Sequence, residues 1–137
     1  MARHVEFLVH THGLTATSHS RGGSASRRVR YVRFRPVRSE VTYAVALHEI
    51  GHVVGRGRSA PRLQAEAAAW VWALENALPD AVGERFRGQV RRSLGSYLRW
   101  ALARGARPGV SPAGAPKLPH PDSVFWQLVR WGDSAET

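Results

Sequence analysis

Residues 48–52, His-Glu-Ile-Gly-His, are the part of this sequence best suited to chemistry, and they lie in an apolar run over residues 41–54 that predicts a helix. On a helix, histidines four residues apart project from one face, so both imidazoles can bind a single Zn²⁺. Glu49 then stands beside the metal, where a general base must be to take a proton from a metal-activated water. The pattern predicts a zinc site with His48 and His52 as ligands.

The alternative is that both histidines are ordinary core side chains, satisfied by backbone carbonyls. In that case two imidazoles and a carboxylate on a buried helix would leave several polar groups to satisfy without a metal, which is costly. We therefore prefer the zinc interpretation.

A catalytic zinc site needs a third protein ligand. The metzincin motif, His-Glu-x-x-His-x-x-Gly-x-x-His, fits as far as Gly55, but Arg58 stands where the third histidine belongs, and a cation cannot bind zinc. Gly55 instead predicts a helix end in the left-handed conformation. Ser59 or Ala60 as N-cap, with Pro61 in the first turn, then predicts a second helix that folds back on the first.

This second helix carries a single charge in an apolar stripe. The stripe consists of residues at helical spacing: Leu63, Glu66, Ala67, Trp70, Ala73, Leu74 and Ala77. A lone carboxylate on a buried face is costly unless it is paired or bound to a metal, and this helix returns past the two histidines. Glu66 is the predicted third ligand. The rival is Glu75, whose neighbours form a less apolar face and predict a solvated side chain.

The residues from Tyr43 to Gly55, followed by residues 66–70 and closed by Leu78 and Pro79, resemble the gluzincin metallopeptidases. Within that group they look most like the small ImmA/IrrE-like proteins of bacterial mobile elements and phages. The resemblance implies a zincin-like fold and peptide-bond hydrolysis. It also implies a role for each of four residues: the ligands His48, His52 and Glu66, and the base Glu49.

Composition limits the remaining possibilities. The chain has 137 residues, is 43% apolar and contains no cysteine, which predicts one small domain over residues 1–137 without disulfides or thiolate zinc ligands. No apolar run is long enough to span a bilayer, and the N-terminus lacks a signal pattern. We expect a soluble intracellular protein, in the cytoplasm, without membrane contact.

The formal charge of +10 is almost entirely arginine, concentrated in residues 27–38, 56–62 and 85–104. Such a field attracts nucleic acids and acidic proteins, in a salt-sensitive and non-specific manner. A solvated basic surface that keeps the protein soluble is the alternative, because no nucleic-acid recognition motif accompanies the charge.

The N-terminal part predicts a small sheet. Residues 4–10 and 28–35 alternate enough for two strands, and residues 15–26 between them, rich in Ser, Thr and Gly, predict a mobile loop. Ser39 is the expected N-cap of the zinc helix, with Glu40 complementing its dipole.

The C-terminal part predicts two more helices. Residues 80–104 form an amphipathic helix that Gly105 ends, residues 107–119 form a Pro/Gly-rich linker, and residues 121–131 form a short terminal helix.

Several further residues invite a functional interpretation. Three histidines near the N-terminus are expected on the surface, and the tryptophans are expected in the core and not in a base-stacking platform. Tyr43 and His120 are possible donors to a transition state. The residues expected on the surface or in the core are His10, His12, His19, Trp70, Trp72, Trp100, Trp126 and Trp131.

The resulting hypothesis is an α+β, zincin-like domain, with a short antiparallel sheet packed on an active-site helix and a glutamate helix, and further helices behind. Its function would be zinc-dependent peptide hydrolysis of a peptide or protein substrate. The alternative is a basic nucleic-acid- or protein-binding module with a structural or vestigial zinc site, in which a residue such as His120 fills the fourth metal position. A third possibility is a protease that a partner inhibits or regulates.

Overall fold

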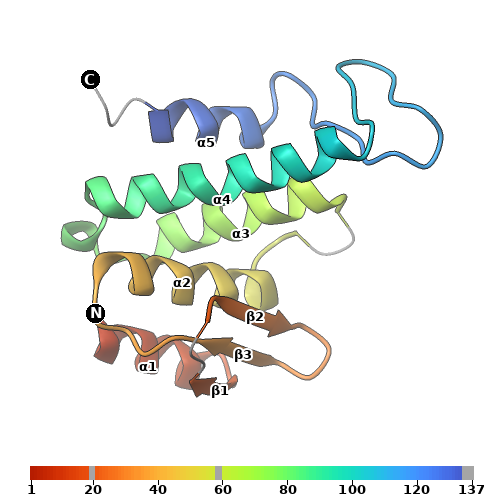
Figure 1. The fold of residues 1–137 in the computed structure, drawn as a ribbon. Coiled ribbons are helices and arrows are strands. Elements are labelled where there is room, and N and C mark those ends of the chain that lie inside the picture. Colours follow the sequence, from red (N-terminus) through yellow and green to blue (C-terminus); the bar gives the residue numbers. More distant parts are fainter. Residues whose placement is uncertain (19–20, 58–59, 134–137) are drawn as a thin grey trace.

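The computed structural model describes residues 1–18, 21–57 and 60–133, and within these ranges the chain is α+β, as predicted (Figure 1). The elements in chain order are α1 (Ala2–Thr11), β1 (Thr15–Ser18), β2 (Gly23–Ser26), β3 (Tyr31–Phe34), α2 (Glu40–Val54), α3 (Arg62–Asn76), a 3-10 turn (Pro79–Ala81), α4 (Glu84–Ala103) and α5 (Val124–Asp133). None of the helices in the described ranges combines the length and the apolar character that a membrane crossing requires.

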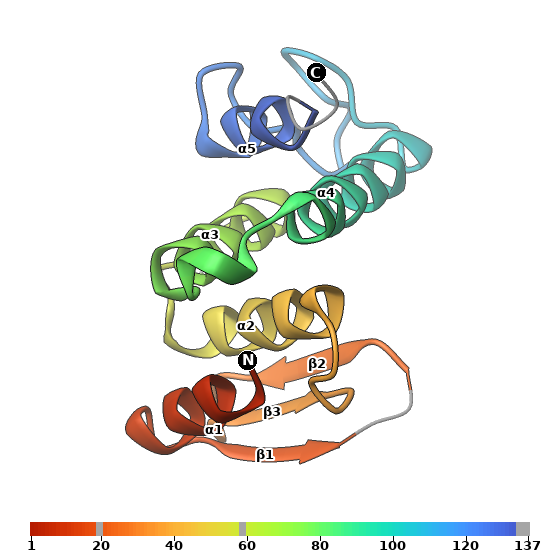
Figure 2. The ribbon, with the colours of Figure 1, turned by 90° about the vertical axis from the view of Figure 1, so that its left-hand side faces the viewer.

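The elements stack in layers (Figure 2). The sheet and α1 lie at one end, α2 covers the sheet, α3 and α4 lie on α2, and α5 lies at the opposite end. Helix α2 therefore has the sheet on one side and α3 on the other. The His-Glu-Ile-Gly-His segment of α2 thus lies between these two layers, in the middle of the molecule.

The sheet is mixed, in the order β1-β3-β2, and not antiparallel as predicted. β3 runs parallel to β1 and antiparallel to β2. Of the three strands, β3 alone carries large apolar side chains that are buried, Val32 and Phe34, so it occupies the centre. The small polar side chains of β1 and β2 suit the two edges, where one side of the backbone stays unpaired.

Two sequence predictions are wrong in this region. In the first, hydrogen bonding between strands outweighs the local amino-acid composition. In the second, the apolar residues follow helical and not alternating spacing. The predicted loop over residues 15–26 contains β1 and β2, whose Ser-, Thr- and Gly-rich residues form strands by pairing with β3. The predicted strand over residues 4–10 is the helix α1. Its buried side chains, Val5 and Leu8, are three residues apart, whereas Phe7, which the alternating pattern would have buried, is 62% exposed.

The second predicted strand and the start of α2 agree better with the sequence. The strand expected over residues 28–35 is present but shorter, as β3. Ser39 is the N-cap of α2, and its hydroxyl accepts from Thr42 N at 3.1 Å while Ser39 N donates to Thr42 Oγ1 at 2.9 Å. Glu40 has a role that the sequence did not reveal, because its carboxylate accepts from the backbone N–H groups of Gly83 and Phe86 at 2.7 and 2.8 Å. It caps the start of α4.

The ends of the helices differ from expectation at two places. Gly55 was expected to be left-handed, but its φ is −78° and its backbone is extended. A glycine is needed there for close approach, since a Cβ would lie 2.5 Å from the carbonyl oxygen of Gly51. The N-cap of α3 is Pro61, whereas Ser59 and Arg58 lie outside the described residues.

The C-terminal predictions hold with shifted boundaries. The helix expected over residues 80–104 divides into the 3-10 turn and α4, and Gly105 ends α4 with a left-handed φ of +94°. Residues 107–119 contain neither helix nor strand, as the linker prediction required. The terminal helix expected over residues 121–131 is α5, which begins at Val124.

Tyr43 belongs to the core and not to a catalytic site. Its side chain is fully buried against Phe86, with ring centres 6.3 Å apart. Its hydroxyl accepts from Leu78 N at 2.9 Å and shares a 2.7 Å hydrogen bond with His4 Nδ1. The idea that Tyr43 donates to a transition state is therefore wrong.

Candidate metal centre

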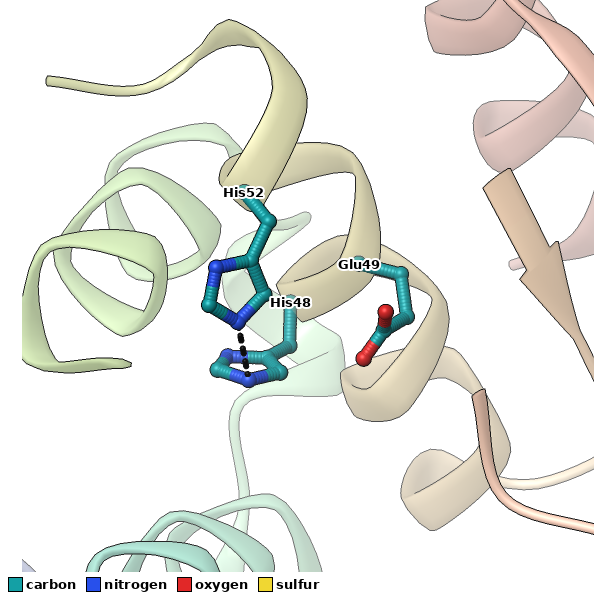
Figure 3. Close-up of side chains that lie close together, drawn as sticks. All are labelled: His48, Glu49 and His52. Carbon is teal, nitrogen blue, oxygen red and sulfur yellow. Dashed lines mark hydrogen bonds between the residues drawn. The ribbon is translucent and has the colours of Figure 1, made fainter. Parts of the chain in front are cut away.

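Three side-chain atoms from two helices converge at one point. His48 and His52 project from the same side of α2 with their Nε2 atoms 3.1 Å apart (Figure 3). Glu66 Oε2, from α3, lies 2.8 Å from His48 Nε2 and 2.9 Å from His52 Nε2. Glu66 is 2% exposed, so its carboxylate makes these two contacts in place of contacts with water. The structure brings the three predicted ligands together.

This triangle has the dimensions of one face of a zinc site. Tetrahedral zinc with bonds of about 2.0 Å separates its ligand atoms by about 3.3 Å, close to the spacing observed here. Two imidazoles and one carboxylate are also a donor set that suits zinc. The residues present therefore fit the metal that the sequence motif predicts.

His48 is positioned by stacking. Its ring lies on the indole of Trp70, with ring centres 4.2 Å apart and planes 24° apart, and Trp70 Nε1 donates to Ser93 Oγ on α4 at 3.0 Å. His48 Nδ1 is buried and has no hydrogen-bond partner among the described residues. The orientation of this imidazole thus depends on the indole and on the atoms that Nε2 meets.

The electrostatics favour an ionised Glu66. Burial alone would raise the pKa of this carboxyl, but hydrogen bonds and electrostatic attraction to His48 and His52 hold it well below its usual range. Burial lowers the pKa of His48, whereas Glu66 outweighs the effect of burial on His52 and raises its pKa. An ionised, buried carboxylate that faces two imidazoles is positioned to bind a cation.

Glu49 lies beside the ligands on the next position of α2. Its carboxylate and the nitrogens of the two histidines offer ligand atoms within 4.8 Å of one another. Burial, reinforced by the negative charge of Glu66 and opposed by His52, raises the pKa of Glu49 to about 7. A base with a pKa near the working pH is the most effective kind for proton transfer. The geometry and the pKa both suit the role that the sequence assigned to Glu49.

Gly23 leaves the room that Glu49 occupies. A Cβ built on this residue of β2 would lie 2.8 Å from Glu49 Cγ. The edge strand β2 therefore passes directly over the predicted base. Sequence reasoning missed this contact, although the Gly22-Gly23 pair in a Ser-rich segment marked a place where backbone and side chain come close.

Arg27 fixes the C-terminal end of α2. Its guanidinium donates to the carbonyl oxygen of His52 at 3.2 and 3.1 Å and to that of Gly55 at 3.0 Å. A cation at this position satisfies carbonyls that the helix leaves unpaired and complements the helix dipole. The sequence had assigned Arg27 to the basic surface.

Tyr97, on α4, is the other residue that the sequence did not reveal. Burial and the negative charge of the Glu66 carboxylate raise the pKa of Tyr97 to about 12. The guanidinium carbon of Arg62 lies 5.4 Å from the centre of the Tyr97 ring. A signal existed in the sequence, because Tyr97 shares the inward face of α4 with Val90, Leu94 and Ala101 at helical spacing.

The remaining candidates lie outside this cluster. Glu75 is exposed, as predicted, and His120 is exposed with its imidazole accepting from Asp122 N. His10 is exposed, but His12 is half-buried with its ring 5.7 Å from that of Trp72, and His19 lies outside the described residues. The tryptophans are at least partly buried and belong to the core and its margin, as predicted: Trp70, Trp72, Trp100, Trp126 and Trp131.

Comparisons of the chain with protein-family models, with curated proteins and with solved structures give no match.

Proposed function

We propose that this protein is a zinc-dependent peptidase of the zincin type. The observation that carries the proposal is the convergence of His48, His52 and Glu66 within hydrogen-bond distance of one another, beside a buried carboxylate whose pKa lies near neutrality. A donor triangle alone is compatible with a structural metal. The adjacent base is what favours catalysis, because a structural site has no use for a proton acceptor.

Each residue then has a defined task. Zinc, when bound, supplies Lewis acidity for hydrolysis, and His48, His52 and Glu66 hold it. Glu49 accepts a proton from the attacking water and passes it to the leaving amine. Glu49 is 9% exposed, so the proton transfer takes place largely out of contact with bulk water.

The fold also suggests how a peptide is held. β2 pairs with β3 on one side, and its other side has no strand partner among the described residues. Because Gly23 of β2 lies against Glu49, an extended peptide that adds to this free edge would run past the base. The substrate we propose is therefore an extended peptide segment, bound mainly through its backbone.

The decisive experiment combines metal analysis with a peptide-library digest of the wild type and Glu49→Gln. Glutamine keeps the shape but cannot accept a proton, so we expect zinc in both proteins and a loss of cleavage of at least about a hundredfold in the variant. If both proteins carry zinc in a closed coordination sphere and cleave nothing, the peptidase proposal is wrong.

A second candidate, a nucleic-acid-binding module with a structural or vestigial zinc site, has one specific observation in its favour. Between Glu6 and Glu40 the sequence contains seven arginines and no acidic residue. Five of these arginines are exposed around β3: Arg28, Arg30, Arg33, Arg35 and Arg38. This surface has the charge that phosphates require, but it shows no recognition motif, so we rank it second.

A further inference from the structure

A cationic pocket lies where the start of α3 meets the end of α4 and the loop that follows α4 (Figure 1). Its volume is about 560 Å³. Three basic side chains line it, one from each of these segments: Arg62, Arg104 and Lys117. None of the described residues that line the pocket is acidic. The cavity therefore has the charge that an anionic ligand requires.

Aromatic rings hold the two guanidinium groups in place. The guanidinium carbon of Arg62 lies 5.4 Å from the centre of the Tyr97 ring, and that of Arg104 lies 4.7 Å from the centre of the Trp100 ring. Arg104 Nη1 also donates to the carbonyl oxygen of Trp100 at 3.2 Å. Among the described residues, no carboxylate forms an ion pair with the three cations of the pocket.

The pocket lies beside the proposed metal centre. Arg62 precedes Glu66 by four residues on α3. Because a helix rises about 1.5 Å per residue and residues four apart share a face, the two side chains lie about 6 Å apart along one side of α3. An extended peptide rises about 3.3 Å per residue. A peptide that crosses the metal centre would therefore reach the pocket within about two or three residues of the bond to be cleaved.

We propose that this pocket binds a carboxylate group of the substrate, so that the protein acts on acidic peptides. The group is either the side chain of an aspartate or glutamate or the carboxylate at the end of the peptide. Guanidinium groups suit both, because their planar N–H donors match the two oxygens of a carboxylate. The inference rests on the proposed peptidase function. It makes Arg62, Arg104 and Lys117 determinants of specificity, with no part in zinc binding or in proton transfer.

The test measures peptide binding to zinc-loaded Glu49→Gln, which should hold a peptide without cleaving it. The probes are peptide pools labelled with an uncharged fluorophore, with either glutamate or glutamine at one position and random neutral residues elsewhere. Each pool is made with a free and with an amidated C-terminus. At low ionic strength we expect the carboxylate to improve affinity about tenfold or more, because hydrogen bonds to charged groups are the strong ones.

Two triple variants of equal charge separate the pocket from the general basic field. Arg62→Gln/Arg104→Gln/Lys117→Gln removes the cations of the pocket and should abolish the preference for a carboxylate. Its zinc content and its affinity for the amidated glutamine pool should not change. The control, Arg85→Gln/Arg92→Gln/Arg99→Gln, removes exposed charges of α4 outside the pocket and should keep the preference.

Circular dichroism and the melting temperature establish that the variants fold. The side chains replaced in the pocket are all exposed, so the fold should persist. If the triple pocket variant does not fold, Arg104→Gln alone gives the same test, with a partial loss of the preference as the expected result.

The arms of the experiment identify the source of the carboxylate. A preference for glutamate that persists with an amidated C-terminus assigns the pocket to an acidic side chain. A preference that requires only the free C-terminus assigns it to the terminal carboxylate. Equal binding of all pools, no measurable binding of any pool, or equal losses in the two triple variants would overturn the inference.

A labelled single-stranded oligonucleotide tests the competing ligand. If the peptide pools bind equally while the oligonucleotide loses affinity in the pocket variant alone, the pocket binds phosphate and the inference is wrong. Failure of the proposed function is recognised separately, because the binding assay requires no cleavage. A wild-type protein that carries zinc and cleaves nothing would overturn the peptidase proposal, whereas cleavage without any preference for a carboxylate would overturn the inference alone.

Discussion

Gly51 and Ala69 bring α2 and α3 into backbone contact. A Cβ built on Gly51 would lie 2.5 Å from the carbonyl oxygen of Ala69, a distance that no real side chain tolerates. Gly51 lies between His48 and His52, and Ala69 lies three residues after Glu66 on the same helix. The glycine inside the motif is thus the reason that the carboxylate of a second helix reaches both imidazoles.

Gly51→Ala should therefore damage both the fold and the proposed metal centre. The added methyl group must push α3 away, and overpacking of this kind costs about 1–3 kcal/mol. We expect a lower melting temperature of the metal-free protein and a zinc affinity reduced at least tenfold, because Glu66 moves with α3.

Gly95→Ala is the matched control, since it places the same methyl group on α4. There the nearest atom is the end of the flexible Arg99 side chain, 3.4 Å from the new Cβ. Alanine is the better helix former, so this variant should gain about 0.5–1 kcal/mol. Equal stability of the two variants would show that α2 and α3 do not touch at Gly51.

The ligand set itself predicts a sharp difference between two glutamates of α3. His52→Ala and Glu66→Ala each remove one corner of the donor triangle, so zinc occupancy after dialysis should fall by more than about tenfold. Glu75→Ala should leave occupancy unchanged, because Glu75 is exposed. Inductively coupled plasma mass spectrometry of the three variants measures this directly, and equal losses would remove Glu66 from the site.

The convergence of His48, His52 and Glu66 was largely predictable because its signals are local. The spacing of His48 and His52 fixes their relative position on any helix, and a lone carboxylate in an apolar stripe identifies Glu66. Tyr97 and Gly23 were not predictable in the same way. Their positions near the site arise from contacts between α4 and α3 and between β2 and α2, which depend on how whole elements pack.

The fold was predicted best where one pattern dominates. Ser39 and Gly105 were placed correctly because capping and a left-handed helix end depend on a few adjacent residues. In α1 the same apolar residues satisfied both an alternating and a helical pattern, and burial of Val5 and Leu8 against the rest of the chain decided between them. The edge strands lacked any apolar signal, so their pairing with β3 could not be inferred.

The raised pKa of Glu49 predicts how the stability of the metal-free protein depends on pH. Its pKa is about 7 in the folded protein and 4.5 in an ordinary environment, so between these values the folded state binds more protons than the unfolded state. Stability attributable to Glu49 is complete below about pH 4.5 and is lost as the pH rises through 7.

Glu49→Gln abolishes this dependence. As the pH rises from 4.5 to 8, we expect the free energy of unfolding of the variant to increase relative to that of the wild type. The difference should reach about 3 kcal/mol. Urea denaturation of chelator-treated protein at several pH values measures it. Glu75→Gln, at an exposed carboxylate, should follow the wild type at every pH. A constant difference between Glu49→Gln and wild type would contradict the raised pKa.

Arg27 should matter for stability, in contrast to the exposed arginines near it. Arg27→Gln removes the guanidinium that holds the carbonyl oxygens of His52 and Gly55, and we expect a loss of about 1–2 kcal/mol together with weaker zinc binding. Arg33→Gln removes the same charge from an exposed position on β3 and should change stability by less than about 0.5 kcal/mol. Thermal denaturation with and without zinc compares the two.

The exposed arginines predict the character of any nucleic-acid binding, and this separates the two candidate functions. With charge but no recognition motif, affinity for a labelled DNA duplex should fall steeply with salt and depend little on sequence. Replacing Arg28, Arg33, Arg35 and Arg38 by glutamine should reduce the slope of log K against log salt by up to about 3 to 4, since each phosphate contact contributes about 0.9.

Zinc content should not change, because none of the four is a proposed ligand. Arg30 is left in place because it donates to the carbonyl oxygen of His12. A tight complex that resists salt and selects a sequence would instead make nucleic-acid recognition the main function and the zinc site its structural support.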